Sequence, residues 1–166
     1  MKKLLCSVAL VGVLAVPSFL GAQVTVSPQI SFADDVDLGL GGSVAFPLEQ
    51  LHEAMEGFAS FDLFFPGDNL GYWEIDAILR YLIEIDNPDV LPFVSGGLAI
   101  GSFSIDLPAG VPDLGFGSST EFGLKLGGGA KFKAEDALSP WADLHFGLGD
   151  IPGFTFRVGI GFTVGG

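Results

Sequence analysis

Apolar residues alternate with small or polar residues along most of the chain after residue 23. Over residues 36–48 the even positions hold mainly Val, Leu and Phe, whereas the odd positions hold mainly Asp, Gly, Ser and Ala. Alternation with a period of two is typical of a strand whose two faces meet different environments. The pattern predicts eight strands, over residues 24–33, 36–48, 59–65, 73–85, 91–105, 121–132, 141–148 and 154–164. We therefore expect an all-β chain forming one domain.

Turn-forming residues lie between these segments. They are Asp34-Asp35, residues 66–69, residues 87–89, residues 108–119, Ser139-Pro140 and residues 149–153. Such clusters of Gly, Pro, Asn and Asp favour tight connections between antiparallel strands. A short helix is predicted only over residues 47–57, where Leu48, Leu51 and Met55 fall at helical spacing. For residues 91–105 the pattern does not decide which face points outward, because Phe93 and Phe103 fall on the face of the small residues.

The less apolar face of the strands carries charges of both signs among many Gly, Ser and Thr residues. Glycine weakens a strand, so a face in contact with water has no need of so many. A narrow lumen does need small residues, because eight strands enclose a space only just wide enough for side chains. The polar residues expected to meet in that lumen are Glu74, Asp76, Arg80, Glu84, Glu121, Lys125, Asp143, His145 and Arg157. The apolar face should then point outward, into lipid.

Composition agrees with a lipid-facing surface. The chain is 49% hydrophobic and has a mean hydropathy of +0.54, although it contains 20 acidic residues. Two of its seven basic residues precede residue 23, which leaves five against 20 acidic residues and a net charge of −15. Such a charge excludes nucleic acid as a partner. Since no run of 18 apolar residues follows residue 23, the pattern also excludes helical membrane spans.

The first 22 residues have the features of a secretory signal peptide. Lys2 and Lys3 precede an apolar stretch, which ends at the small residues of Leu20-Gly21-Ala22. We expect cleavage near Ala22, a mature domain over residues 23–166, and export toward the bacterial outer membrane. Cys6 is the only cysteine, so the mature domain has no disulfide to stabilise it. A good core or a closed hydrogen-bonded sheet must do so instead.

Aromatic residues fall near the ends of the predicted strands, as in the interfacial girdles of membrane barrels. With the N-terminus on the periplasmic side, one set lies at the outer ends and the other at the inner ends. The outer set is Phe32, Phe65, Trp73, Phe122 and Phe154, and the inner set is Phe46, Phe132, Trp141 and Phe162.

With these features the chain resembles the small eight-stranded outer-membrane barrels, the OmpA-like and OmpX-like group and the outer membrane protein beta-barrel domain family. The resemblance covers residues 23–166 and rests on the signal peptide, the eight alternating strands, the segment Leu91-Pro92-Phe93-Val94-Ser95-Gly96-Gly97 and the last strand, Phe154 to Val164. It implies an eight-stranded antiparallel up-and-down transmembrane β-barrel. It also implies outer-membrane lipid, lipopolysaccharide and the outer-membrane assembly machinery as partners of a monomer.

Catalytic chemistry has one candidate, His145 with Asp143, since a histidine oriented by a carboxylate can activate a serine. No serine follows at the His-x-Ser spacing of barrel deacylases, although Ser95 or Ser119 can substitute from another strand. We therefore predict no catalytic residues and no enzymatic activity. The acidic turns match no dedicated metal loop, so neither a metal nor a cofactor is predicted.

The predicted function is a structural or interaction role in the cell envelope, with a lumen plugged by paired charges. One alternative is a small pore, opened when ion pairs exchange partners, or an OmpW-like transporter of small molecules. A second alternative is a soluble periplasmic lipid-binding barrel with its faces inverted, so that residues of 154–164 such as Phe156 point inward.

Overall fold

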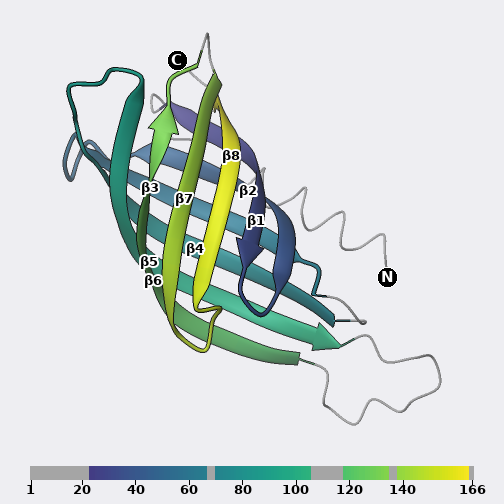
Figure 1. Ribbon diagram of the computed structural model, residues 1–166. Coiled ribbons are helices and arrows are strands. Elements are labelled where there is room, and N and C mark those ends of the chain that lie inside the picture. Colours follow the sequence, from purple (N-terminus) through teal and green to yellow (C-terminus); the bar gives the residue numbers. More distant parts are fainter. Residues whose placement is uncertain (1–22, 67–69, 106–117, 135–137, 165–166) are drawn as a thin grey trace.

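The chain forms a closed antiparallel barrel of eight strands (Figure 1). The computed structural model describes residues 23–66, 70–105, 118–134 and 138–164. The strands are β1 (Val24–Ala33), β2 (Asp37–Pro47), β3 (Met55–Phe64), β4 (Leu70–Leu82), β5 (Val90–Ile105), β6 (Ser118–Phe132), β7 (Leu138–Gly149) and β8 (Phe154–Val164). Each strand pairs with the next in sequence, and β8 pairs with β1. The predicted up-and-down barrel is confirmed.

Two predictions of secondary structure are wrong. Residues 47–57 contain no helix, because the Leu48 amide bonds the Met55 carbonyl (2.9 Å) and closes a hairpin from which β3 begins. Ser139-Pro140 is not a turn but part of β7, where Pro140 lies opposite Ile160. The predicted signal peptide and residues 67–69 and 108–117 of two predicted turns lie outside the described residues. Among the residues that the structure does describe, no helix is long and apolar enough to cross a membrane.

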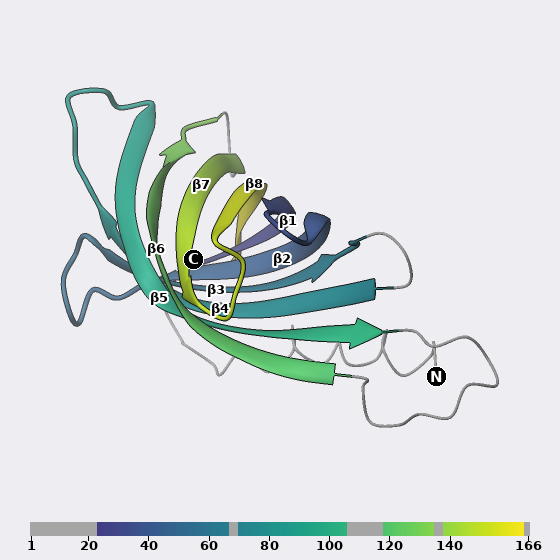
Figure 2. The same ribbon diagram turned by 60° about the horizontal axis from the view of Figure 1, so that its bottom comes forward.

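The barrel has two distinct ends. We call the end where β1 begins the proximal end and the opposite end the distal end. The connections 48–54 and 83–89 leave the proximal end. Both views show these two loops extending beyond the barrel on the same side, with their tips apart (Figures 1 and 2). At the distal end, β1 and β2 are joined by a tight turn in which Asp35 (φ 67°) and Asp37 (φ 59°) are left-handed. This turn buries Val36, which the alternation had assigned to the apolar outer face.

The two faces of the sheet are the reverse of those in a water-soluble protein. On β8, the outward-facing Phe156, Val158 and Ile160 are 44%, 39% and 47% exposed, whereas Arg157 between them is 0% exposed. Soluble proteins almost never bury arginine while exposing a continuous apolar surface. In β5 the outward residues are Val94, Leu98 and Ile100, so Phe93 and Phe103 belong to the lumen. The apolar parity therefore points outward on every strand.

Inside the lumen, apolar side chains form a layer on either side of a polar centre. The proximal layer consists of Ala45, Phe58, Ile78 and Trp141. The distal layer consists of Ala33, Val36, Phe64 and Tyr72, with Phe103 packed against them. Aromatic rings contact each other in both layers, edge to face for Phe58 and Trp141 (centroids 5.5 Å apart) and tilted for Tyr72 and Phe103 (4.5 Å apart). Such separations are typical of favourable aromatic pairs.

The charged lumen as a candidate functional site

Eight charged side chains form an alternating chain of ion pairs along the lumen. In order from the proximal end they are Lys131, Glu56, Arg80, Asp143, Arg157, Asp76, Lys125 and Glu74. We call this chain the ion-pair ladder. Each member contacts an opposite charge on at least one side, and every pair joins residues of two different strands. Buried charges persist in proteins only when they are paired in this way.

Arg157 is the centre of the ladder. Its Nε donates to Asp143 Oδ1 (3.0 Å), while its Nη1 donates to Asp76 Oδ2 (2.6 Å) and to Ser60 Oγ (2.9 Å). The planar guanidinium suits this role, because its five N–H donors point in several fixed directions at once. One side chain on β8 thereby bonds residues of β3, β4 and β7 across the lumen.

Arg80 carries the ladder through the proximal aromatic layer. Its Nη2 donates to Asp143 Oδ2 (2.8 Å), and its Nη1 lies 3.5 Å from Glu56 Oε1. The guanidinium carbon lies 3.5 Å from the ring centroid of Phe58 and 5.0 Å from that of Trp141. Both distances are within the range of cation–π attraction. The arginine therefore fills an apolar layer without leaving its charge uncompensated.

The ladder ends differently at its two ends. At the distal end Lys125 bonds Glu74 and lies 3.2 Å from Asp76, and the Tyr72 hydroxyl donates to Glu74 Oε2 (3.2 Å). The ladder therefore ends against the distal aromatic layer. At the proximal end Lys131 bonds Glu56, where the lysine side chain is 19% exposed. The ladder thus approaches water only at this end.

Asp62 joins β1 to the same network. It accepts hydrogen bonds from Gln29 Nε2 to both carboxylate oxygens (2.8 Å each) and from Ser31 Oγ. The guanidinium of Arg157 is 3.9 Å away. Polar groups buried at the centre of the barrel are therefore tied to strands on both sides of the β1–β8 seam.

The structure brings seven of the nine predicted lumen residues together: Glu74, Asp76, Arg80, Lys125, Asp143, His145 and Arg157. Glu84 does not join them, because β4 ends at Leu82 and leaves this side chain exposed. Glu121 is half-buried on β6, and its Oε2 has no hydrogen-bond partner among the described residues. Sequence reasoning left Glu56, Asp62 and Lys131 out of the network. Strand parity could have placed the last two there, whereas Glu56 fell in the predicted helix.

The predicted aromatic girdles need one correction. Trp141 is only 4% exposed and packs in the proximal layer of the lumen, because it shares the inward parity of Asp143 and His145. Of the other residues, Phe32, Phe65, Trp73, Phe122 and Phe154 lie toward the distal end, and Phe46, Phe132 and Phe162 toward the proximal end. Phe65 and Phe122 are the most exposed of them, whereas Phe46, Trp73 and Phe154 are half-buried.

Ser95, His145 and Asp143 have the outline of a catalytic triad. The Ser95 hydroxyl lies 2.8 Å from His145 Nε2, and His145 Nδ1 lies 3.4 Å from Asp143 Oδ1. However, the guanidinium of Arg157 lies closer to Nδ1, at 3.0 Å, and can only donate. Nδ1 must therefore accept, which leaves the ring proton on Nε2 facing the serine. In this tautomer Nε2–H donates to the serine oxygen, whereas a triad has an unprotonated nitrogen there to accept the serine proton.

This tautomer is directly testable. We expect the ¹⁵N spectrum of the folded barrel to show His145 protonated at Nε2, with Nδ1 as the bare nitrogen. Ser95→Ala should cost about 1 kcal/mol of stability, the typical value of one hydrogen bond. A proton on Nδ1 would contradict the assignment, and so would covalent labelling of Ser95 by a serine-directed phosphonate. His145→Gln is the matched control, because it keeps polar atoms near Ser95 and Arg157.

The ladder and the two aromatic layers leave little free space. Arg157, Lys125 and His145 are all 0% exposed, so no water-sized gap borders these side chains.

The fold is similar to that of several solved structures, whereas no protein-family model and no curated protein matches the sequence. The N-terminal β-barrel domain of Pseudomonas aeruginosa OprF aligns with a TM-score of 0.65 and 19% identity, covering 86% of this chain and 97% of that chain. Neisserial surface protein A gives 0.55 and 12%, covering 86% and 94%. Ail, the attachment invasion locus protein of Yersinia pestis, gives 0.54 and 16%, covering 86% and 97%. The chain therefore has the fold of the small eight-stranded outer-membrane β-barrels.

Proposed function

We propose that this protein is a non-enzymatic barrel of the bacterial outer membrane, with a structural or interaction role in the cell envelope. The observation that carries the proposal is the inversion of its two faces, with Arg157 and Lys125 buried while Phe156 and Ile160 are exposed. An apolar surface that encircles the barrel is stable in contact with acyl chains and costly in water. The closed sheet supports the same placement, because hydrocarbon cannot satisfy an open strand edge.

The membrane placement implies the partners and processing predicted from the sequence. The mature barrel then begins near Gln23 after cleavage at Ala22, and the assembly machinery inserts it as a monomer. Outer-membrane lipid surrounds the apolar band, and lipopolysaccharide lies around the outer end. In this orientation the proximal end faces the periplasm.

A plugged lumen fits the structure better than a transport path. An OmpW-like route for apolar molecules needs an apolar interior, whereas the centre of this lumen holds the ion-pair ladder. A pore that opens by exchange of ion pairs would need Arg157 to release two carboxylates at once. Removing one partner of a buried pair is strongly unfavourable, which favours the plug. The soluble lipid-binding alternative requires Phe156 and Val158 to point inward, and they point outward.

Cell fractionation combined with gel electrophoresis tests the membrane placement. We expect the full-length chain in the outer-membrane fraction, as a band that runs faster before heating than after, because folded membrane barrels resist detergent. The control is the same chain heated before extraction. Recovery of the folded protein in the soluble periplasm without detergent would refute the proposal.

Planar-bilayer recordings test the plugged lumen separately. We expect the purified barrel to give no stable single-channel steps in neutral lipid, because the charged centre leaves no water-filled path. An eight-stranded barrel lacking ladder charges, such as the double variant Arg157→Ala/Asp143→Ala, serves as the comparison. Regular conductance steps from the unaltered protein would favour the pore.

A further inference from the structure

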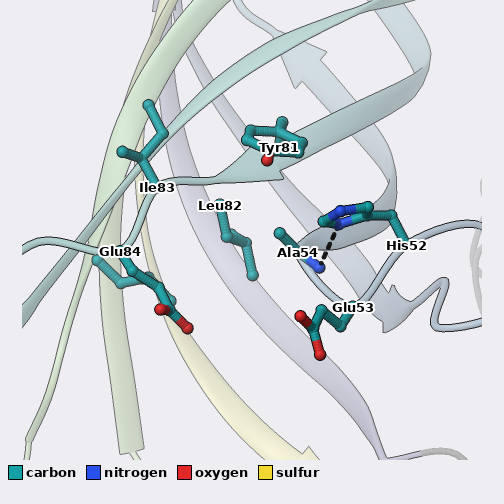
Figure 3. Close-up of a pocket in the computed structure, with 8 residues that line it drawn as sticks. His52, Glu53, Ala54, Tyr81, Leu82, Ile83 and Glu84 are labelled. Carbon is teal, nitrogen blue, oxygen red and sulfur yellow. Dashed lines mark hydrogen bonds between the residues drawn. The ribbon is translucent and has the colours of Figure 1, made fainter.

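A cleft at the proximal end lies outside the ladder and both aromatic layers. It encloses about 440 Å³ and is lined by His52, Glu53, Ala54, Tyr81, Leu82, Ile83, Glu84 and Leu91 (Figure 3). We call it the proximal cleft. It opens where β4 ends, because the Leu82 amide still bonds Ala54 (2.8 Å) and the Ile83 amide bonds Pro92 (2.8 Å). Beyond these two bonds the connections 48–54 and 83–89 diverge and leave the space between them.

The walls of the cleft combine apolar surface with two carboxylates. Tyr81 and Ile83 are 45% and 38% exposed, and Leu82 lies between them and the acidic residues. Figure 3 shows Glu53 and Glu84 at opposite sides of the cleft, one from each connection. Neither carboxylate forms an ion pair with any residue that the structure describes. The cleft therefore places two unpaired carboxylates beside the apolar side chain of Leu82.

The chain itself has little positive charge to place there. Neither residues 47–57 nor residues 83–91 contain Lys or Arg, although together they contain six acidic residues, Glu49, Glu53, Glu56, Glu84, Asp86 and Asp89. Four of the five basic residues after residue 23 belong to the ion-pair ladder. The fifth, Lys133, lines a different hollow beyond Asp89. A cation that pairs with Glu53 and Glu84 must therefore come from another molecule.

The aromatic wall favours an organic cation over a metal ion. The rings of His52 and Tyr81 lie 5.7 Å apart, and the Ala54 amide donates to His52 Nδ1 (3.1 Å). Because Nδ1 accepts this bond, the neutral ring carries its proton on Nε2 and has no free nitrogen lone pair for a metal. No group of three metal-binding side chains occurs among the described residues. Aromatic faces attract guanidinium and ammonium groups instead.

We propose that the proximal cleft binds a basic, partly apolar peptide segment of a periplasmic protein. Arginine or lysine side chains of the segment pair with Glu53 and Glu84, and an adjacent aliphatic side chain packs on Leu82. The periplasmic location of this partner rests on the proposed membrane placement and orientation. The recognition chemistry rests only on the cleft.

NMR titration of the folded, ¹⁵N-labelled protein in zwitterionic micelles tests the proposal. The probe is the capped hexapeptide Gly-Leu-Arg-Leu-Arg-Gly, and its two control peptides replace both Leu by Ser or both Arg by neutral citrulline. We expect saturable shifts of the amides of residues 52–54 and 81–84 with the first peptide. Each control should bind several-fold more weakly, because it lacks either the apolar contact or the charge.

Matched double variants distinguish the cleft from general attraction to an acidic surface. Glu53→Gln/Glu84→Gln removes the two cleft carboxylates and should weaken binding by about tenfold, as expected for two solvent-accessible ion pairs. Glu49→Gln/Asp86→Asn removes the same charge from the same connections outside the cleft, and should change affinity by less than about twofold. Heat-shifted bands show that both variants are folded.

Two results would overturn the cleft proposal: absence of saturable shifts in residues 52–54 and 81–84, or equal weakening by both double variants. Its failure is distinguishable from failure of the membrane placement. If the peptide binds in micelles but fractionation finds the protein soluble in the periplasm, the cleft proposal stands and the membrane placement is refuted. If the protein is found in the outer membrane but binds none of the peptides, the membrane placement stands and the cleft proposal is refuted.

Discussion

Arg157→Met is expected to lower the free energy of unfolding by about 3–5 kcal/mol, the usual cost of breaking a buried ion pair. The substitution keeps the apolar part of the side chain but leaves Asp76 and Asp143 without their central cation. Neither carboxylate can reach water, since both are almost fully buried. The measurement is urea-induced unfolding of the barrel in lipid vesicles, followed by tryptophan fluorescence.

Lys133→Met is the matched control for this prediction. It removes the same charge and adds the same side chain, but Lys133 lies beyond the end of β6 and is exposed. We expect a change of less than about 0.5 kcal/mol, as for most surface substitutions. If Arg157→Met were equally mild, the ladder would contribute little and the close packing of the lumen would have to hold the barrel alone.

Leu144→Arg should cost about 2–4 kcal/mol, the range for a cation on the lipid face of a barrel near the bilayer midplane. Leu144 lies at the middle of β7, faces outward and is opposite Phe156 on β8. Moving a guanidinium into hydrocarbon at this depth requires it to reach back to water or to draw water in. The same vesicle-based unfolding experiment gives the free-energy change.

Leu148→Arg is the comparison at a different depth in the membrane. This residue has the same outward orientation but lies one residue before the distal end of β7, where the cost should fall to about 0–1 kcal/mol. A soluble barrel would behave differently, since an arginine on a water-exposed face changes stability little at either position. Equal, small effects of both substitutions would therefore contradict a lipid-facing band.

The sequence pattern was sufficient to predict the barrel because apolar and polar residues alternate almost strictly along the strands. Charges such as Arg157 and Lys125 stand between apolar residues on single strands, so one parity identified both the lumen and the outer surface. Residues 91–105 were ambiguous for a physical reason. Phe93 fills the lumen beside Arg80, and Phe103 packs in the distal layer, so aromatic bulk occurs on the inward parity as well.

The errors arose where a local signal competed with this parity. Trp141 was assigned to a girdle because it lies near a strand end, although its parity already placed it inside. Leu48 and Met55 suggested a helix, and this concealed the inward position of Glu56. The pairing within the lumen could not be predicted at all. It depends on contacts such as those of Arg157 with Asp143, 14 positions away, and with Ser60, 97 positions away, which only the register of the closed sheet brings together.

The position of Arg157 on the last strand also bears on assembly. Until β8 takes its place, the growing sheet holds the buried acidic residues Glu56, Asp62, Glu74, Asp76 and Asp143 with only Arg80, Lys125 and Lys131 to balance them. Such an intermediate has an excess of negative charge that must remain hydrated. When β8 pairs with β1, Arg157 neutralises much of this negative charge, and the water around the carboxylates is released in the same step. Completion of the barrel should therefore be abrupt, with partly closed forms scarcely populated.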